Sequence, residues 1–490
     1  MPLDIKTKQL INIAIMTFWS MFASYTFNAI LIVFMTMPTT QAGLGLDDKH
    51  AYMLYGVTQS VGYILPVIGG YIADNVLGVR RSISYGALLL SCGYLILVIA
   101  NQLFPEHLTS AFLMSYALVP IGSSLFLGTA SALIGRIYKN DEALSKRGMT
   151  VYYVTINVGS MLGIGIAPYL IHSQYGAMSI FIVAFAGKFL AWVNFVWRRR
   201  LYDDVLEGAD STPMSRKKWG ILAGYFVAAY AVTSLLFSHP ALSFYIIGSA
   251  IVVTLIYYVR KTLSLAGDSR KKQLFSTYLL LAVFCFFVLY AQMNTSLIMF
   301  IKNNSDQMLF GIKLHPSSFQ LINPIAIVLI GGLLTRFYKR FPKFNIPYQF
   351  ATGLIIGAVG IALLYIAGLQ QHHGIVSGSY IGLSYFLLTI SELFISAIGL
   401  SMISLYCDMS MISFAMGVFY LVVSLAQLVS GRLSELVALP KGKLLPTETL
   451  PIYTHFYLYL AIAAVIAGVV FSISAKVANQ HFHKQGIALP

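Results

Sequence analysis

The chain has 490 residues, of which 58% are hydrophobic, 14% are aromatic and only 10% are charged. Soluble domains carry about 25% charged residues, so this composition excludes a soluble multidomain enzyme. The apolar residues gather in blocks long enough to cross a hydrocarbon core about 30 Å thick. The formal net charge of +15 is therefore interpreted as a signal of membrane orientation rather than of nucleic-acid binding. We predict a multi-pass helical protein of the lipid bilayer.

The polar residues do not form the motifs of a common enzyme or metal site. The three cysteines, Cys92, Cys285 and Cys407, lie in or beside apolar blocks without metal-binding or disulfide spacing. The adjacent pair His372 and His373 is more typical of a solvated turn than of a metal site. There is no Walker A pattern, glycine-rich nucleotide fingerprint or hydrolytic triad. We expect neither an enzyme nor a bound metal or other cofactor.

The apolar blocks, taken in chain order, predict fourteen transmembrane helices. Their approximate bounds are 10–36, 51–73, 82–100, 111–135, 150–170, 177–197, 219–237, 241–259, 274–300, 318–337, 347–368, 379–404, 411–431 and 453–475. The fold class predicted from them is an all-α membrane protein.

The basic residues between the blocks predict how the chain is oriented. If both termini are cytoplasmic, 25 of the 32 Lys and Arg residues lie in inside segments and 6 lie in outside segments. Such an excess on one side fixes the orientation of a membrane protein. The remaining basic residue, Lys188, falls near the middle of the block 177–197. We expect its side chain to snorkel along the surface of the helix bundle.

An internal repeat divides the chain. Gly69-Gly70 ends the second block, and Gly331-Gly332 ends the corresponding block of the second half, each before a cluster of basic residues. Parallel repeats of six helices are how many secondary transporters build two bundles. We therefore predict an N-terminal bundle at 1–200, linkers with an inserted hairpin at 201–272, and a C-terminal bundle at 273–490.

The stretch GGYIADNVLGVRR, from Gly69 to Arg81, resembles the loop between the second and third helices of the major facilitator superfamily. Glycines allow close helix contact, and an acid followed by bases can form a charge cluster that breaks and re-forms between states. An anchor for the positive-inside orientation is the alternative reading of the arginines. The superfamily's usual Arg after the acid is Asn75 here. The gating residues predicted from this stretch are Gly69, Gly70, Asp74, Arg80 and Arg81.

A second resemblance is more specific. The segment VYYVTINVGS at 151–160 is similar to the signature of the proton-dependent oligopeptide transporter family, and the segments YAQMNTSL at 290–297, QLINP at 320–324 and SELFISAIGLSM at 391–402 agree with its bacterial branch. The resemblance implies two six-helix bundles plus a two-helix insertion. It also implies proton-coupled transport of di- and tripeptides, a bacterial inner membrane and a monomer.

The first helix departs from the family. Where the family carries Glu-x-x-Glu-Arg, this chain has Thr17, Ser20 and Met21, and Leu127 takes the place of a Lys in the fourth helix. Two cations for a peptide carboxylate are thereby lost, each a charge-assisted contact of about 1.5–3 kcal/mol. The alternatives that remain open are a uniporter, an exporter of a peptide-like metabolite such as a siderophore or an antibiotic, and a substrate sensor without transport.

The resemblance assigns the end of the site that binds an amine. It implies that Asn157, Asn323 and Glu392 hold a substrate's amino group, with Tyr25, Tyr63, Tyr153 and Gln292 lining the cavity. Independently, Glu392 is the only carboxylate near the middle of any block, where a charge costs about 2.5–3.5 kcal/mol. It either pairs with an ammonium or takes up a proton. The alternative for Glu392, Asn157 and Asn323 is interhelical hydrogen bonding. We predict an alternating-access transporter of small amine-bearing solutes.

Overall fold

The computed structural model describes residues 4–139, 141–341, 344–440, 442, 444–486 and 489. Within these residues, fourteen helical segments are long and apolar enough to cross a membrane. This confirms the predicted all-α membrane fold and each of its fourteen blocks. The described residues contain one sheet, in which β1 (Met308–Leu309) pairs antiparallel with β2 (Ile312–Lys313). Three of the basic residues counted above, Lys343, Lys441 and Lys443, lie outside the described residues.

The chain divides into two compact units. Unit 1 comprises Met1–Leu46 and Val61–Pro240, and unit 2 comprises Asp47–Ser60 and Ala241–Pro490. Helix α3 (Asp48–Ile72) is therefore shared, with its first half in unit 2 and its second half in unit 1. The helices of the expected hairpin, α10 (Arg216–Ser238) and α11 (Pro240–Leu263), also go to different units. The expected division at residues 200 and 272 remains a prediction.

Unit 1 is built from helices that are broken at defined points. Besides the second half of α3, its elements are α1 (Ile5–Asn28), α2 (Leu31–Thr36), η1 (Thr39–Gln41), η2 (Ala73–Leu77), α4 (Val79–Leu103), η3 (Pro105–His107), α5 (Leu108–Tyr116), α6 (Leu118–Phe126), α7 (Thr129–Ile137), α8 (Glu142–Ile171), α9 (Ala177–Trp197), η4 (Arg199–Val205), η5 (Gly208–Ser211) and α10. Gly128, with φ +83°, separates α6 from α7, a conformation that glycine adopts without strain. Leu127, expected to replace a family lysine, lies at this break.

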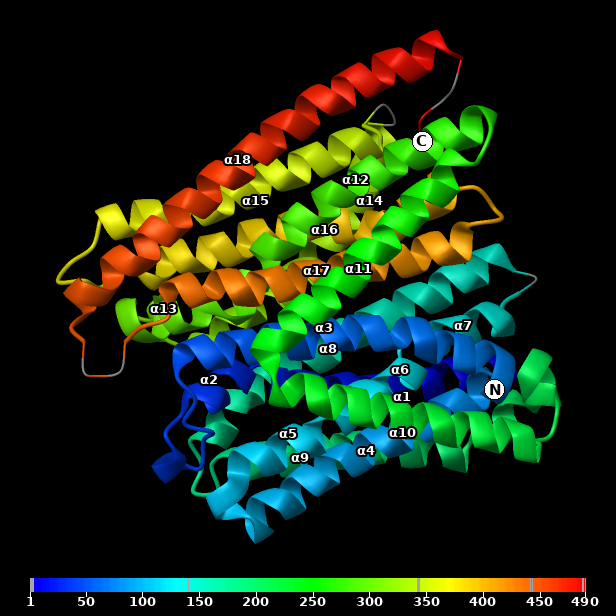
Figure 1. Cartoon of the computed structure of the whole chain (residues 1–490), viewed down its shortest axis with the longest axis horizontal. Coiled ribbons are helices and arrows are strands. Elements are labelled where there is room, and N and C mark those ends of the chain that lie inside the picture. The colour runs from blue at the N-terminus through cyan, green and yellow to red at the C-terminus, as the bar shows by residue number, and fades with distance from the viewer. Residues whose placement is uncertain are drawn as a thin grey trace. The chain divides into compact units, whose positions relative to one another are not determined.

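Unit 2 contains α18, which at 39 residues is the longest helix of the described residues (Figure 1). Its elements are the first half of α3, then α11, α12 (Gly267–Ala291), η6 (Gln292–Asn294), α13 (Ser296–Asn304), β1, β2, η7 (Pro316–Leu321), α14 (Ile322–Arg340), α15 (Ile346–Leu369), α16 (Gly378–Tyr406), α17 (Ile412–Ser434), η8 (Glu435–Val437) and α18 (Pro446–Lys484). Helices α15 and α18 run side by side along much of their length (Figure 1). A side chain at Gly468 of α18 would meet Ile355 of α15 at 2.8 Å, so a glycine permits this approach.

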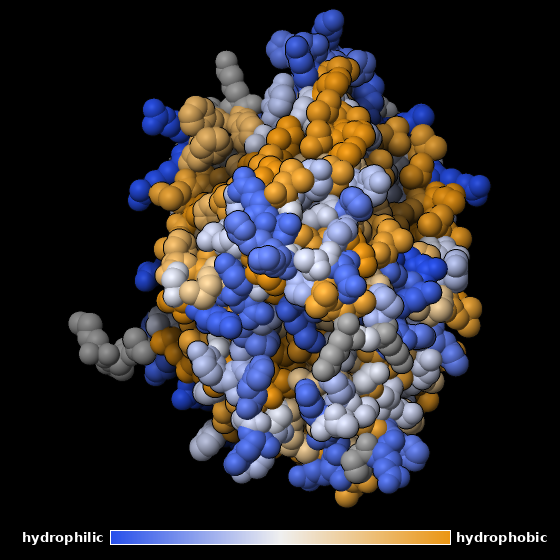
Figure 2. Space-filling model, turned by 90° about the vertical axis from the view of Figure 1, so that its left-hand side faces the viewer, coloured by the Kyte–Doolittle hydropathy of each residue, from blue (hydrophilic) through white to orange (hydrophobic). Residues whose placement is uncertain are grey.

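The outer surfaces of the helices are apolar. Large hydrophobic side chains such as Val253 on α11 and Val465 and Ile473 on α18 are 47–66% exposed. Figure 2 shows one face of the molecule, with hydrophobic residues over much of its upper part and sides and hydrophilic residues across its middle and lower part. Contiguous apolar surface of this kind is unfavourable in water and is satisfied by lipid.

Candidate functional site

Glu392 lies in the middle of α16 and is bound by a side chain of α14. The Nδ2 atom of Asn323, the second residue of α14, donates a hydrogen bond to Glu392 Oε2 at 2.7 Å. The same amide donates to Thr389 Oγ1 at 3.2 Å, and Thr389 lies one turn before Glu392. Asn323 thus fixes the carboxylate and the adjacent turn of α16 at once.

The surroundings of Glu392 are polar but uncharged. Tyr290 of α12 is a second hydrogen-bonding neighbour of the carboxylate. Thr389 donates to the carbonyl of Tyr385 at 2.8 Å, and the Tyr385 hydroxyl donates to the carbonyl of Met293 in η6 at 2.6 Å. Among the described residues, no ion pair joins Glu392 to a Lys or Arg. The site therefore has a carboxylate that can accept either a proton or an external cation.

Gln292 is held elsewhere in unit 2. Its side chain is fully buried, and its Nε2 atom donates to Ser430 Oγ of α17 at 2.7 Å. Its Oε1 atom accepts from Ser296 at 2.6 Å and from Ser434 at 3.0 Å. These serines occupy both ends of the amide, so Gln292 joins η6 to α17. The structure brings Asn323 and Glu392 together and gives Gln292 a separate set of partners.

The other predicted site residues belong to unit 1. Asn157 of α8 is buried, and its Nδ2 atom donates to the carbonyl of Tyr153 one turn earlier at 2.9 Å. Tyr153 and Tyr25 of α1 are 45% and 38% exposed, although both lie inside membrane spans. Tyr63 of α3 is partly buried. The amide of Asn157 is used within its own helix here, so its predicted role requires it to exchange that partner.

The expectation for Lys188 was wrong. Its side chain does not snorkel along the surface of the bundle but is 3% exposed and points from α9 to α1. The ammonium Nζ donates to Ser20 O at 2.8 Å, to Ser20 Oγ at 2.8 Å and to Ser24 Oγ at 2.6 Å. The physical reason is that three oxygens of α1 match the three donors of an ammonium. Burial is thereby compensated without a carboxylate.

The two predicted gating glycines occupy different surroundings. A Cβ atom at Gly69 would meet the carbonyl oxygen of Ser124 at 2.3 Å, whereas a Cβ atom at Gly70 would meet nothing within 4 Å. Gly69 therefore allows α3 to pack backbone to backbone against α6. Gly70 makes no such contact.

The arginines of the same loop bind partners other than Asp74. Arg80 forms an ion pair with Asp203 of η4. The Nη1 atom of Arg81 donates to the carbonyl oxygens of Thr212 at 2.7 Å and Ala209 at 3.2 Å. Asp74 is exposed and pairs with no Lys or Arg among the described residues. The charge cluster was expected to form around Asp74, but Arg80 and Arg81 bind partners from the segment 199–212 instead.

Asp210 of η5 is the centre of that cluster. It is 3% exposed, pairs with Arg136 of α7 at 3.1 Å and accepts from the backbone N–H of Arg80 at 3.2 Å. Gly78, with φ +81°, leaves room for it, because a Cβ atom there would lie 2.3 Å from the carboxylate. We call Arg80, Arg136, Asp203 and Asp210 the loop clasp.

The sequence reasoning missed Asp210. A signal was available, since four of the 17 acids of the chain, Asp203, Asp204, Glu207 and Asp210, lie within eight positions directly after Arg198–Arg200. Glu207 pairs with Lys139 at 2.9 Å. The hydrogen bond and the positive charge of Lys139 hold the pKa of Glu207 below its ordinary value.

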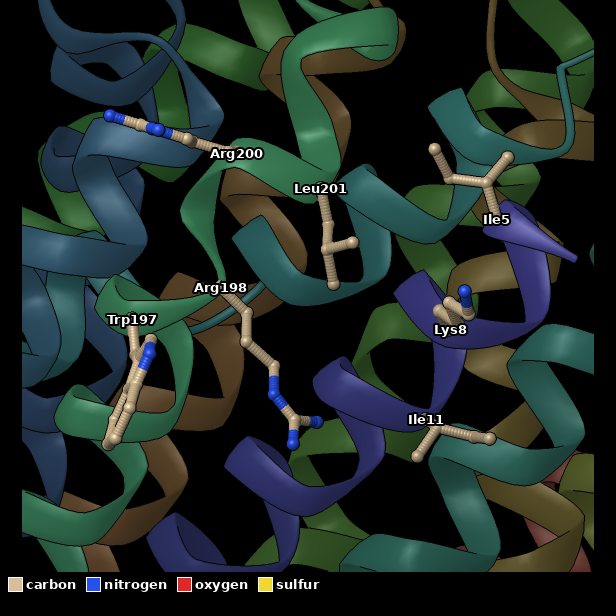
Figure 3. A pocket seen from close by; sticks show the side chains of 7 residues that line it. All are labelled: Ile5, Lys8, Ile11, Trp197, Arg198, Arg200 and Leu201. Atoms are coloured by element: carbon tan, nitrogen blue, oxygen red, sulfur yellow. The ribbon is translucent and has the colours of Figure 1, made fainter. Parts of the chain in front are cut away.

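A pocket of about 600 Å³ opens beside the N-terminal end of α1, away from the mid-span residues (Figure 3). Its lining residues are Ile5, Lys8, Ile11, Trp197, Arg198, Arg200 and Leu201. In Figure 3 Arg198 reaches toward α1, whereas Arg200 points away from it. The charges of this pocket are all positive, so it differs from the acidic surroundings that an amine requires.

Fourteen candidate spanning helices among the described residues, with a carboxylate and an ammonium at mid-span, are typical of a membrane transporter. Comparison with known proteins supports this class. The profile of the POT family matches residues 80–451. Dipeptide and tripeptide permease A of Chromobacterium violaceum is 30% identical over 461 residues, which cover 94% of this chain and 91% of that relative. Dipeptide and tripeptide permease B of Photorhabdus asymbiotica is 29% identical and covers 94% of both chains. The chain belongs to the POT family.

Solved structures agree on the fold. The chain is similar to tetrameric PepTSo2, with a TM-score of 0.84 and 24% identity over 97% of this chain and 99% of that one. It is also similar to a bacterial homologue of the human drug peptide transporters PepT1 and PepT2, with a TM-score of 0.82 and 23% identity over the same shares. The major facilitator fold predicted from the sequence is confirmed.

Proposed function

We propose that this transporter moves di- or tripeptides, or closely related amine-bearing solutes, with Glu392 binding the amine. The single observation that carries the proposal is the mid-span carboxylate that Asn323 and Tyr290 hold without a basic partner among the described residues. A carboxylate in such surroundings gains more from a cation than one in water does, because the low dielectric strengthens the attraction. The names of the relatives, which are peptide permeases, support the substrate class.

Glu392 also supports proton coupling. A carboxylate that loses its cation inside the membrane is stabilised by taking up a proton, since an uncompensated buried charge is costly. One carboxylate cannot hold the ammonium and the proton at the same time, so the two occupy Glu392 in turn. We propose symport with protons by alternating access, in which Glu392 passes its proton to another polar group of the same cavity when the ammonium binds, so that substrate and proton cross together.

The remaining predicted roles complete the proposal. Asn157, Tyr153, Tyr25 and Tyr63 of unit 1 and Gln292 of unit 2 contribute polar groups to substrate binding. The 25-to-6 distribution of basic residues supports an orientation with both termini cytoplasmic, and the bacterial relatives support an inner membrane location. We propose a monomer as the transporting species.

Uptake into proteoliposomes tests the proposal. A labelled dipeptide is offered with an inward proton gradient, with and without a tenfold excess of unlabelled dipeptide or of the same dipeptide acetylated at its amine. We expect the free dipeptide to compete and the acetylated one to fail. Equal competition by both would remove the amine from recognition. Glu392→Gln should abolish the stimulation by the proton gradient, and unchanged stimulation would contradict coupling at this residue.

Counterflow separates the other candidate functions. A uniporter exchanges labelled for unlabelled dipeptide without a proton gradient, and its net uptake does not respond to one. A sensor binds the dipeptide without flux. The loss of acids at Thr17 and Ser20 is the observation that favours these alternatives. Accumulation of the label above the external concentration would exclude both.

A further inference from the structure

Unit 1 contains a polar cluster on α1 that the proposed amine site does not use. Thr17, Ser20 and Ser24 follow a spacing of three and four residues, which places them on one face of the helix. Lys188 of α9 donates to Ser20 and Ser24 from that side. We call Thr17, Ser20, Ser24 and Lys188 the α1–α9 cluster.

The cluster is built by close packing. A Cβ atom at Gly187 would meet Ala23 Cβ at 2.8 Å and the carbonyl oxygen of Trp19 at 3.0 Å. A larger residue would therefore push α9 away from α1. Because position 187 is glycine, the neighbouring Lys188 can extend its ammonium to the polar face of α1.

The cluster keeps hydrogen-bond donors that its own acceptors do not use. Ser20 and Ser24 accept from the ammonium, and among the described residues neither hydroxyl donates a side-chain hydrogen bond in return. Thr17 is fully buried, and its Oγ1 atom has no partner among those residues. Each hydroxyl carries one donor proton. Three hydroxyl protons and the positive charge of the ammonium can together bind an anion.

The cluster also lacks an internal counter-charge. Helices α8 and α9 pack against α1, and α4 packs against α9; their sequences contain no Asp or Glu apart from Glu142 at the first position of α8. The acids of η4, which also contacts α1, lie near the N-terminal end of α1, where Asp204 accepts from Gln9. In the described part of the chain, Lys188 is the only basic residue near the middle of a candidate span. The ammonium is therefore satisfied by neutral oxygens and retains its attraction for a negative charge.

We propose that the α1–α9 cluster binds a carboxylate of the transported solute, with Lys188 as the cation. This rests on the proposed function, because the carboxylate in question is the C-terminal carboxylate of a peptide. Ser24 is the partly exposed member of the cluster, so the carboxylate approaches beside Ser24. The carboxylate then replaces Ser24 Oγ as the acceptor of one hydrogen bond from Lys188 Nζ. Lys188 then supplies, from a different helix, the positive charge that Met21 and Leu127 lack.

The test compares a dipeptide with its C-terminal amide as competitors of labelled dipeptide uptake. The ratio of the two inhibitory concentrations is measured within each variant, so expression level cancels. We expect the wild-type protein to prefer the free acid by about 10- to 100-fold, as for a charge-assisted contact. Lys188→Met should bring the ratio to about one, and Lys188→Arg should retain part of the preference. Lys261 is an exposed lysine on α11, so Lys261→Met should keep the full ratio.

Thr17→Val separates binding from folding. Valine removes the buried unpartnered hydroxyl while keeping its shape, so the ligand-free protein should be as stable as the wild type or more stable. The same variant should lower the preference for the free acid. If Lys188→Met and Thr17→Val both kept the full preference for the free acid, the inference would be overturned. It would also be overturned if the wild-type protein showed no preference for the free acid and chloride raised its thermal stability only when Lys188 was present, because the cluster would then bind a simple anion instead of the substrate. A wild-type protein that takes up no dipeptide would instead show that the proposed function itself had failed.

Discussion

Asn323 of α14 donates to the carboxylate of Glu392 on α16 at 2.7 Å, and this contact joins two helices through one amide. An amide cannot change its charge, so the pair keeps the negative charge of Glu392 available. A lysine or arginine in place of Asn323 would neutralise the carboxylate permanently. The contact therefore allows Glu392 to exchange partners during a transport cycle.

Asn323→Ala should weaken substrate binding. It removes the hydrogen bond that orients the carboxylate, and hydrogen bonds to charged groups contribute about 1.5–3 kcal/mol. We expect the KM for dipeptide uptake to rise by about tenfold or more. Thr389→Val removes only the longer contact of 3.2 Å to the same amide, so it should change KM less. An equal effect of both variants would mean that α16 packing, rather than the Glu392 contact, determines affinity.

Gly69→Ala should destabilise unit 1, and Gly70→Ala should not. A methyl group at Gly69 collides with the backbone of Ser124, whereas at Gly70 it meets open space. Overpacking of this kind costs about 1–3 kcal/mol, and alanine at Gly70 even favours the helix by about 1 kcal/mol. Thermal unfolding of the two purified variants measures the difference. Equal melting temperatures would contradict close packing of α3 on α6.

Asp210→Ala should disrupt the loop clasp and loosen the segment 199–212. It leaves Arg136 and the N–H of Arg80 without their carboxylate, and removing one partner of a buried ion pair costs about 3–5 kcal/mol. Since Arg136 is partly exposed, we expect the lower end of this range. Limited proteolysis within residues 199–212 should become faster. Glu207→Ala, in an exposed pair with Lys139, is the control and should be cleaved at the wild-type rate.

The ion pair of Glu207 with Lys139 should persist over the pH range in which transport is measured. Because the pKa of Glu207 is lowered below 4.5 by Lys139, its contribution is present above that value and is lost as the pH falls through the lowered pKa. Hydrogen exchange in residues 199–212, corrected for its intrinsic rate, should match at about pH 5 and about pH 8. A large difference between them would assign a pH-sensitive role to this segment.

The sequence alone established the membrane class, the fourteen spans and the family. These depend on local information, since the length of an apolar block and the order of residues in a motif are read directly from the chain. The importance of Glu392 could be predicted in the same way, because the cost of a charge at mid-span does not depend on which residue lies beside it.

The tertiary structure decided which side chains meet. Lys188 and Ser20 are separated by 168 positions, and Arg80 and Asp210 by 130, so no local pattern pairs them. Gly69 and Gly70 are neighbours in the sequence but differ in what a side chain would meet. The physical reason is that helices bury one face each, and only their packing determines which face, and therefore which partner, each residue receives.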